Sequence, residues 1–192
     1  MTPIYALCDF ELLTKYNISF SQYIQKITSY NIVYIQYRDK QNNTQLQKQN
    51  LLTLKSLTNI PIIINDNLDL LDIANGIHMG QEDLIRLKSN LNIENNLLFF
   101  KFLKRKYPKK IFGLSTHNEL EILEANKLDL DYIGLGAYRD TSTKTDIKNI
   151  LGSKISYLAK ISNHPVGAIG GVKIMDTIDN ISYNVIGSDL LK

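Results

Sequence analysis

Short apolar runs recur along the whole chain, and each is followed by polar or glycine-containing residues and then by a segment of helical pattern. The runs are rich in Ile, Val and Tyr and do not alternate in polarity, which is typical of parallel strands covered by helices. The pattern predicts eight strands, at residues 4–8, 32–37, 61–65, 76–79, 111–115, 132–136, 166–170 and 184–187.

The segments between these runs predict helices at 19–30, 45–57, 68–75, 118–126 and 148–161. Ser19 or Ser21 would cap the first, and Asn118 would open the fourth, with Leu120, Ile122 and Leu123 on one side. Strands that alternate with helices predict a compact α/β fold, a (βα)8 TIM barrel, with an open doubly wound sheet as the alternative.

Two segments depart from a regular barrel pattern. Within residues 84–110, Leu98, Phe99, Phe102 and Leu103 predict the inner face of a helix that ends before Pro108. The cations that follow either complement the end of that helix or form a basic binding patch; they are Lys104, Arg105, Lys106, Lys109 and Lys110. After the last predicted strand only "GSDLLK" remains, which predicts a truncated final helix. Another surface, such as a second subunit of a homo-oligomer, would then cover the gap, or the barrel is incomplete there.

Composition places the chain among ordinary globular domains and excludes several classes. Its 192 residues suit a single domain, residues 1–192, with 44% hydrophobic and 21% charged residues. A net charge of +3 is too small to indicate nucleic-acid binding, and the single Cys8 allows no intramolecular disulfide. The sequence shows neither a signal-peptide pattern nor an apolar run near the roughly 20 residues of a membrane span, so we expect a cytoplasmic location.

Chemically useful residues gather where each predicted strand ends, which in a (βα)8 barrel is the end that carries the active site. Arg38, Lys40 and Lys144 would place three cations around one opening, and Asp66 and Asp83 would add two oxygen ligands from neighbouring strands. The remaining members of this set are Gln36, Asn65, His78, Gln81, Ser115, His117, Thr141, Thr143, Gly170, Gly171, Gly187 and Ser188.

This combination has the composition of a Mg²⁺–diphosphate site. Mg²⁺ is usually held by one or two carboxylates together with substrate phosphates, and cations stabilise a departing diphosphate. The glycines after the last two strands would let backbone N–H groups approach a second phosphate. Taken singly, each feature has a plainer interpretation: a surface ion-pair cluster for Arg38 and Lys40, helix caps for Asp66 and Asp83, and a buried hydrogen-bonded residue for His78. Ser115 and His117 have no evident third partner for a nucleophilic triad.

Seven segments, taken in order, resemble the successive motifs of the thiamine-phosphate synthase family, and they cover nearly the whole chain. They are "QYRDK", "PIIINDNLDL", "GIHMGQEDL", "FGLSTHNELE", "DYIGLGAYRDTSTK", "PVGAIGGV" and "VIGS". The resemblance implies a (βα)8 barrel that joins hydroxymethylpyrimidine diphosphate to hydroxyethylthiazole phosphate, with Mg²⁺ as cofactor. Diphosphate would leave first, and the thiazole nitrogen would attack the resulting carbocation, so no protein nucleophile is needed.

The same resemblance implies which residues bind the substrates and the metal. The substrate-binding positions would be Gln36, Arg38, Lys40, Asn65, Ser115, Thr141, Thr143, Lys144, Gly171, Ile186 and Gly187. Gln36 would contact the pyrimidine, and its diphosphate would meet Lys40 and Asn65. Lys144, Ser115 and Arg38 would be the catalytic residues, in contact with the departing diphosphate. Asp66 and Asp83 would bind Mg²⁺, while the threonines and the backbone near the glycines would hold the thiazole phosphate.

Three positions depart from the family pattern, and two other functions stay open. Ala137 and Asp140 stand where the family usually carries prolines, and Gly187 stands where many members have serine. The first alternative is a thiazole tautomerase on the same barrel, with His117 as its acid or base. The second is a barrel that binds thiamine precursors without catalysis.

Overall fold

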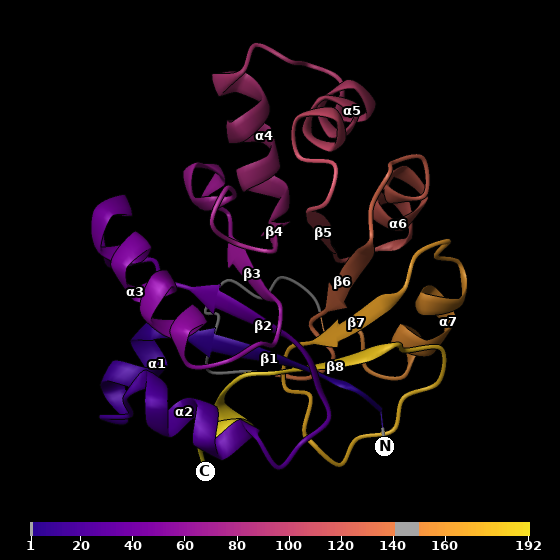
Figure 1. Ribbon diagram of the computed structural model, residues 1–192. Coiled ribbons are helices and arrows are strands. Elements are labelled where there is room, and N and C mark those ends of the chain that lie inside the picture. The colour runs from indigo at the N-terminus through magenta and orange to yellow at the C-terminus, as the bar shows by residue number, and fades with distance from the viewer. Residues whose placement is uncertain (1, 141–149) are drawn as a thin grey trace.

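The computed structural model describes residues 2–140 and 150–192, and its strands form one closed barrel (Figure 1). Each strand pairs in parallel with the next, and β1 pairs with β8 to close the ring. The barrel is therefore confirmed and the open sheet is excluded. The strands are β1 (Ile4–Asp9), β2 (Ile32–Arg38), β3 (Ile62–Asn65), β4 (Gly76–Met79), β5 (Ile111–Thr116), β6 (Tyr132–Gly136), β7 (Val166–Ile169) and β8 (Tyr183–Ile186).

Helices surround the barrel, and several begin at the predicted caps. They are α1 (Phe10–Lys15), α2 (Phe20–Ile27), α3 (Thr44–Ser56), α4 (Gln81–Asn90), α5 (Asn96–Lys106), α6 (Glu119–Ala125) and α7 (Lys154–Lys160). Ser19 caps α2 through a capping box with Gln22, and Asn118 caps α6. After β8 comes a 3₁₀ turn, η2 (Ser188–Leu191).

The predicted helix over 68–75 is wrong. Only a 3₁₀ turn, η1 (Leu68–Leu70), forms in this short connection. Its hydrogen bonds are of the i to i+3 kind, from Leu71 N–H to the Leu68 carbonyl, and by Asn75 the backbone N–H already donates to the Ile62 carbonyl of β3. The predicted helix over 148–161 begins only at Lys154; residues 148–149 lie outside the described part of the chain.

The buried faces of two helices also differ from the prediction. In α5 the buried residues are Phe99, Phe100 and Leu103, whereas Leu98 is 59% exposed. In α6 the buried residues are Ile122 and Ala125, while Leu120 is 75% exposed and Leu123 also faces solvent. When a short helix carries apolar residues on two sides, its sequence does not show which side faces the barrel. Packing against the barrel decides which of these residues are buried.

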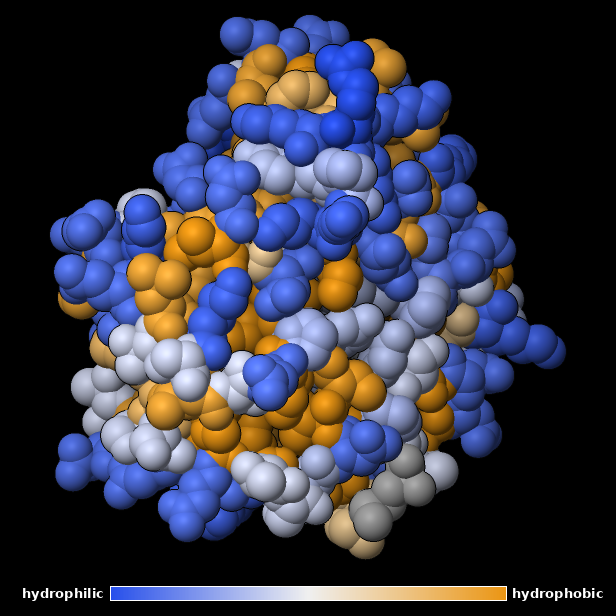
Figure 2. Space-filling model, in the orientation of Figure 1, coloured by the Kyte–Doolittle hydropathy of each residue, from blue (hydrophilic) through white to orange (hydrophobic). Residues whose placement is uncertain are grey.

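The core has two parts, one between the strands and the helices and a smaller one inside the barrel. The inner cluster contains Tyr5, Ile63, Tyr132 and Val185. Figure 2 shows polar side chains over much of the visible face and an apolar area in the region where Figure 1 places β1 and β8. No helix within the described residues is long and apolar enough to cross a membrane.

Candidate active site at the carboxyl end of the barrel

The carboxyl ends of β2, β3 and β4 bring together three of the predicted residues. The ammonium group of Lys40 donates a hydrogen bond to Asp66 Oδ2 at 2.6 Å and lies 3.8 Å from Asp83 Oδ2. We call Lys40, Asp66 and Asp83 the carboxylate cluster. Two acids and one cation, predicted from separate motifs, therefore occupy one site.

Local backbone geometry directs Asp66 into this cluster. Its φ of 57° is unusual for a residue other than glycine, and Gly80 N–H donates to its Oδ1 at 3.0 Å. Asn65 donates to the other carboxylate oxygen. Neither acid caps a helix as the plainer interpretation suggested: Asn67 caps η1, and Gly80 is the N-cap of α4.

The two acids differ in their pKa values although they are close neighbours. Burial by itself would raise the pKa of Asp66, but hydrogen bonds from Lys40 and Asp83, the Lys40 charge and Gly80 N–H lower it below its usual range. Burial, the hydrogen bond with Asp66 and the negative charge of Asp66 raise the pKa of Asp83, against the opposing effect of Lys40 and Arg86. A second cation beside both groups would relieve this repulsion.

The donor set of the cluster fits Mg²⁺. Both acids supply hard oxygen ligands, and within the described residues no group of three or more His, Cys, Asp or Glu side chains forms a denser metal site. A site with only two carboxylates matches Mg²⁺, which keeps several waters and shares its coordination with phosphate.

Arg38 lies on the same side but has an acidic partner that the sequence did not indicate. Its guanidinium donates to Asp9 Oδ2 at 2.5 Å, and Asp9 is 2% exposed. Asp9 also accepts from Leu12 N–H at 3.1 Å and so caps α1. The only sequence signal for this role was the position of Asp9 at the end of the first strand.

A hydrogen-bonded chain of side chains crosses the barrel interior, and we call it the tyrosine chain: Gln36, Tyr5, Tyr132, His78 and Ser115. Gln36 Nε2 lies 2.9 Å from Tyr5 Oη, and the two tyrosine oxygens are 2.7 Å apart. His78 Nδ1 lies 3.1 Å from Tyr132 Oη, and His78 Nε2 lies 2.9 Å from Ser115 Oγ. His78 is thus a buried hydrogen-bonded residue as expected, but the tyrosines were missed because they look like ordinary strand residues.

Ser115 and His117 do not pair with each other. Ser115 contacts His78, whereas His117 Nδ1 lies 2.9 Å from Glu121 Oε2 on α6 and is exposed. The histidine partner of Ser115 is therefore His78 and not His117.

Glycines shape the opposite side of the opening, after β7 and β8. Gly170 and Gly171 have φ values of 85° and 65°, which side chains rarely adopt. A Cβ at Gly171 would lie 2.7 Å from the Asp140 carbonyl oxygen and 2.8 Å from Arg139 Cβ. We call Gly170, Gly171 and Gly187 the glycine edge.

An ion pair next to the glycine edge was not foreseen. Arg139 NH1 lies 2.5 Å from Asp176 Oδ2, and NH2 lies 3.1 Å from Oδ1. Arg139 also donates to the Gly171 carbonyl at 3.2 Å. It therefore ties the segment after β6 to the segment after β7. The predicted residues Thr141, Thr143 and Lys144 lie outside the described residues, and their roles stay predictions.

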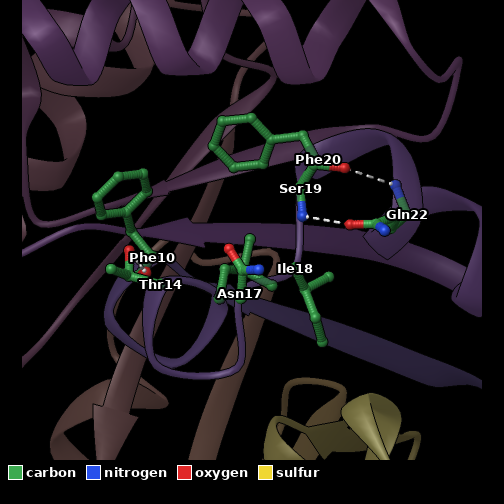
Figure 3. A pocket seen from close by; sticks show the side chains of 8 residues that line it. Phe10, Thr14, Asn17, Ile18, Ser19, Phe20 and Gln22 are labelled. Atoms are coloured by element: carbon green, nitrogen blue, oxygen red, sulfur yellow. Dashed lines mark hydrogen bonds between the residues drawn. The ribbon is translucent and has the colours of Figure 1, made fainter.

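A cavity of about 550 Å³ lies at α1 and α2, apart from these charged groups (Figure 3). Phe10, Ile18 and Phe20 contribute apolar surface, and Ser19 and Gln22, which also line it, are already hydrogen-bonded to each other. None of the predicted site residues within the described part of the chain lines this cavity. The charged residues described above lie instead at the carboxyl ends of the strands.

A closed (βα)8 barrel with cations and paired carboxylates at this end defines a barrel protein suited to phosphorylated ligands. The comparison with known families makes this class specific: a family model described as Thiamine monophosphate synthase matches residues 4–187. The chain belongs to this family, and the expectation of a transferase of the thiamine-phosphate synthase kind is confirmed.

Individual relatives agree with this assignment. The thiamine-phosphate synthase of Picrophilus torridus is 32% identical, covering 94% of this chain and 85% of its own. That of Persephonella marina is 32% identical, covering 92% of this chain and 79% of its own. The solved thiamine phosphate pyrophosphorylase from Pyrococcus furiosus has the same fold, with a TM-score of 0.72, 21% identity, and coverage of 97% of this chain and 86% of that chain.

Proposed function

We propose that this protein couples hydroxymethylpyrimidine diphosphate to hydroxyethylthiazole phosphate, and releases thiamine phosphate and pyrophosphate. The observation that carries the proposal is the carboxylate cluster of Lys40, Asp66 and Asp83, with Arg38 at the end of β2, two residues before Lys40. A diphosphate needs both positive charge and a carboxylate-held metal, and these side chains supply both.

Bond cleavage comes first in this reaction. The C–O bond to the diphosphate breaks, and its electron pair leaves with the pyrophosphate. The thiazole nitrogen then donates its lone pair to the pyrimidine carbocation to form the new C–N bond. When bound, Mg²⁺ neutralises charge on the diphosphate.

The side chains of the protein bind and orient the substrates around these steps. Lys40 and Arg38 would exchange their present acidic partners for diphosphate oxygens, and Ser115 would donate a hydrogen bond to the leaving group. Asp66 and Asp83 would hold the metal. Backbone N–H groups at the glycine edge, near Ile186, would hold the thiazole phosphate on the opposite side.

Thiazole tautomerase is the second candidate, since His117 is exposed and held at 2.9 Å by Glu121, which would suit an acid or base. That reaction involves no diphosphate, so the carboxylate cluster would have no role in it. A binder without catalysis would keep the cluster but release no pyrophosphate.

One assay separates these functions. The purified protein is incubated with both phosphorylated precursors and Mg²⁺, and thiamine phosphate and pyrophosphate are measured together. We expect both products in equal amounts and neither when EDTA replaces Mg²⁺. Precursor binding without product would contradict the synthase function and leave the binder, whereas conversion of a thiazole tautomer alone would indicate the isomerase.

A further inference from the structure

The tyrosine chain is buried almost completely, and this burial fixes the direction of its hydrogen bonds. Tyr5 and Tyr132 are each 1% exposed, Gln36 is 4% exposed and His78 is 6% exposed. A buried hydroxyl that finds no acceptor is destabilising, so each proton in the chain must point to a neighbour.

The direction follows from the end at Gln36. The Gln36 amide nitrogen donates to the Tyr5 oxygen at 2.9 Å, so it cannot accept the Tyr5 proton. Of the described residues, Tyr132 offers the acceptor, at 2.7 Å. Tyr132 has then accepted from Tyr5 and directs its own proton to its other partner, His78 Nδ1, at 3.1 Å.

This order determines the tautomer of His78. Because Nδ1 accepts, the proton of the neutral ring is on Nε2, which donates to Ser115 Oγ at 2.9 Å. The ring is held in place by stacking on Tyr132, with centroids 5.6 Å apart and planes at 19°. Gly134 leaves room for it, since a Cβ there would lie 3.1 Å from His78 Cε1.

Ser115 is left with its own hydroxyl proton free to donate to a ligand. Both tyrosines stay protonated throughout, since burial raises the pKa of Tyr5 and of Tyr132 far above the usual value. The tyrosine chain thus places a hydrogen-bond donor, the Ser115 hydroxyl, at the carboxyl end of β5. An anionic leaving group needs a donor there and not an acceptor.

We propose that Tyr132 is a positioning residue: it fixes the Nε2–H tautomer of His78 and thereby presents Ser115 as a hydrogen-bond donor to the diphosphate. Tyr5 has the corresponding role at the other end, where it orients the amide of Gln36. The catalytic part of this proposal rests on the proposed synthase function, whereas the tautomer does not depend on it.

The test measures the tautomer and the turnover separately. Imidazole nitrogen NMR on the ¹⁵N-labelled protein reports the tautomer of His78, whose signals are identified by their loss in His78→Gln. We expect Nε2–H in the wild type and in Tyr5→Phe, where Tyr132 still donates to His78. In Tyr132→Phe the Nδ1–H form should appear, because Ser115 can then donate to Nε2.

Turnover should follow the tautomer. We expect Tyr132→Phe to lower kcat about tenfold with little change in KM for the thiazole phosphate. Tyr183→Phe is the matched control, since its ring packs edge-on against Tyr132 with centroids 6.4 Å apart but its hydroxyl is outside the chain; it should change neither readout.

Two results would overturn the proposal: Nδ1–H in the wild type, which needs no variant to fold, or an unchanged tautomer in folded Tyr132→Phe. A wild type that shows Nε2–H but makes no thiamine phosphate would instead refute the synthase function and the catalytic role of Tyr132, and the tautomer assignment would stand.

Discussion

The two sides of the barrel opening offer different kinds of groups for binding an anion. On the side of β2 to β4 the binding groups are charged side chains, and in the carboxylate cluster one cation, Lys40, lies beside two acids. On the side of β7 and β8, the glycine edge exposes backbone, and its shape depends on φ values near 65° and 85°. A change of charge should therefore affect chemistry on the first side, whereas a change of shape should affect folding and binding on the second.

The largest effect is expected from Asp66→Asn. Asparagine tolerates the left-handed backbone at this position, so the fold should survive while the metal ligand and the Lys40 partner are lost. We expect kcat/KM to fall by about 10²-fold or more, with only a modest fall in Tm from the lost ion pair with Lys40. Asp69→Asn, at a neighbouring exposed aspartate, is the control and should keep full activity. Activity within a few-fold of wild type in Asp66→Asn would remove this acid from the site.

Gly171→Ala should act mainly through shape. The added Cβ meets the Asp140 carbonyl and Arg139 at a φ of 65°, so we expect a loss of about 2 kcal/mol in unfolding free energy. KM for the thiazole phosphate should rise more than KM for the pyrimidine diphosphate.

Gly152→Ala is the matched control for this variant. Gly152 has a φ of 51° with nothing within 4 Å of its Cβ position, so only the backbone strain of about 1 kcal/mol remains. Equal losses of stability in the two variants would show that the close contacts at Gly171 have no energetic weight.

Asp83→Asn should weaken Mg²⁺ binding by about tenfold and also test the charge repulsion in the cluster. Because the pKa of Asp83 is raised in the folded protein, its ionisation makes the metal-free protein less stable as the pH rises through that pKa. Asp66 has the opposite sign: its contribution is present above the usual aspartate pKa and is lost as the pH falls through its lowered pKa.

Thermal unfolding with and without Mg²⁺, measured from pH 4 to 8, would check this prediction. The Mg²⁺-dependent increase in Tm should disappear in the wild type as the pH falls through the raised pKa of Asp83. It should be small at every pH in Asp83→Asn. An equal Mg²⁺ effect in both proteins would place the metal elsewhere.

The smallest effect is expected at the ion pair beside the glycine edge. Arg139 is 44% exposed, so Asp176→Asn should cost less than about 1 kcal/mol. The hydrogen bond from Arg139 lowers the pKa of Asp176 despite partial burial, so its contribution should be present at neutral pH and lost on acidification. Glu124→Gln, in the exposed pair with Lys127, is the control. Denaturant unfolding in low and in high salt should show the difference in unfolding free energy between Asp176→Asn and its control. A loss above about 2 kcal/mol in Asp176→Asn would contradict this estimate.

The sequence was sufficient to predict the order and approximate bounds of the strands and the charged part of the site. Continuous apolar runs have few stable arrangements other than a covered parallel sheet, and a barrel places their carboxyl ends together. Asp66 and Lys40 could therefore be assigned to one opening from two separate motifs. The helix over 68–75 failed because Asn75 pairs with Ile62 at the start of β3, a contact between distant residues that no local pattern reveals.

The sequence by itself thus predicted the barrel from strand periodicity, the family from the order of seven motifs, and a common opening for Lys40, Asp66 and Asp83 from residue type at strand ends. The pairing of β1 with β8 then excluded the open sheet. Only the tertiary structure decided the partner of Arg38, the inward faces of α5 and α6, the Arg139–Asp176 pair and the tyrosine chain. Each of these is a contact between residues far apart in the chain or a choice between two equally apolar helix faces. Such features depend on how strands and helices pack, and packing is not encoded in any single segment.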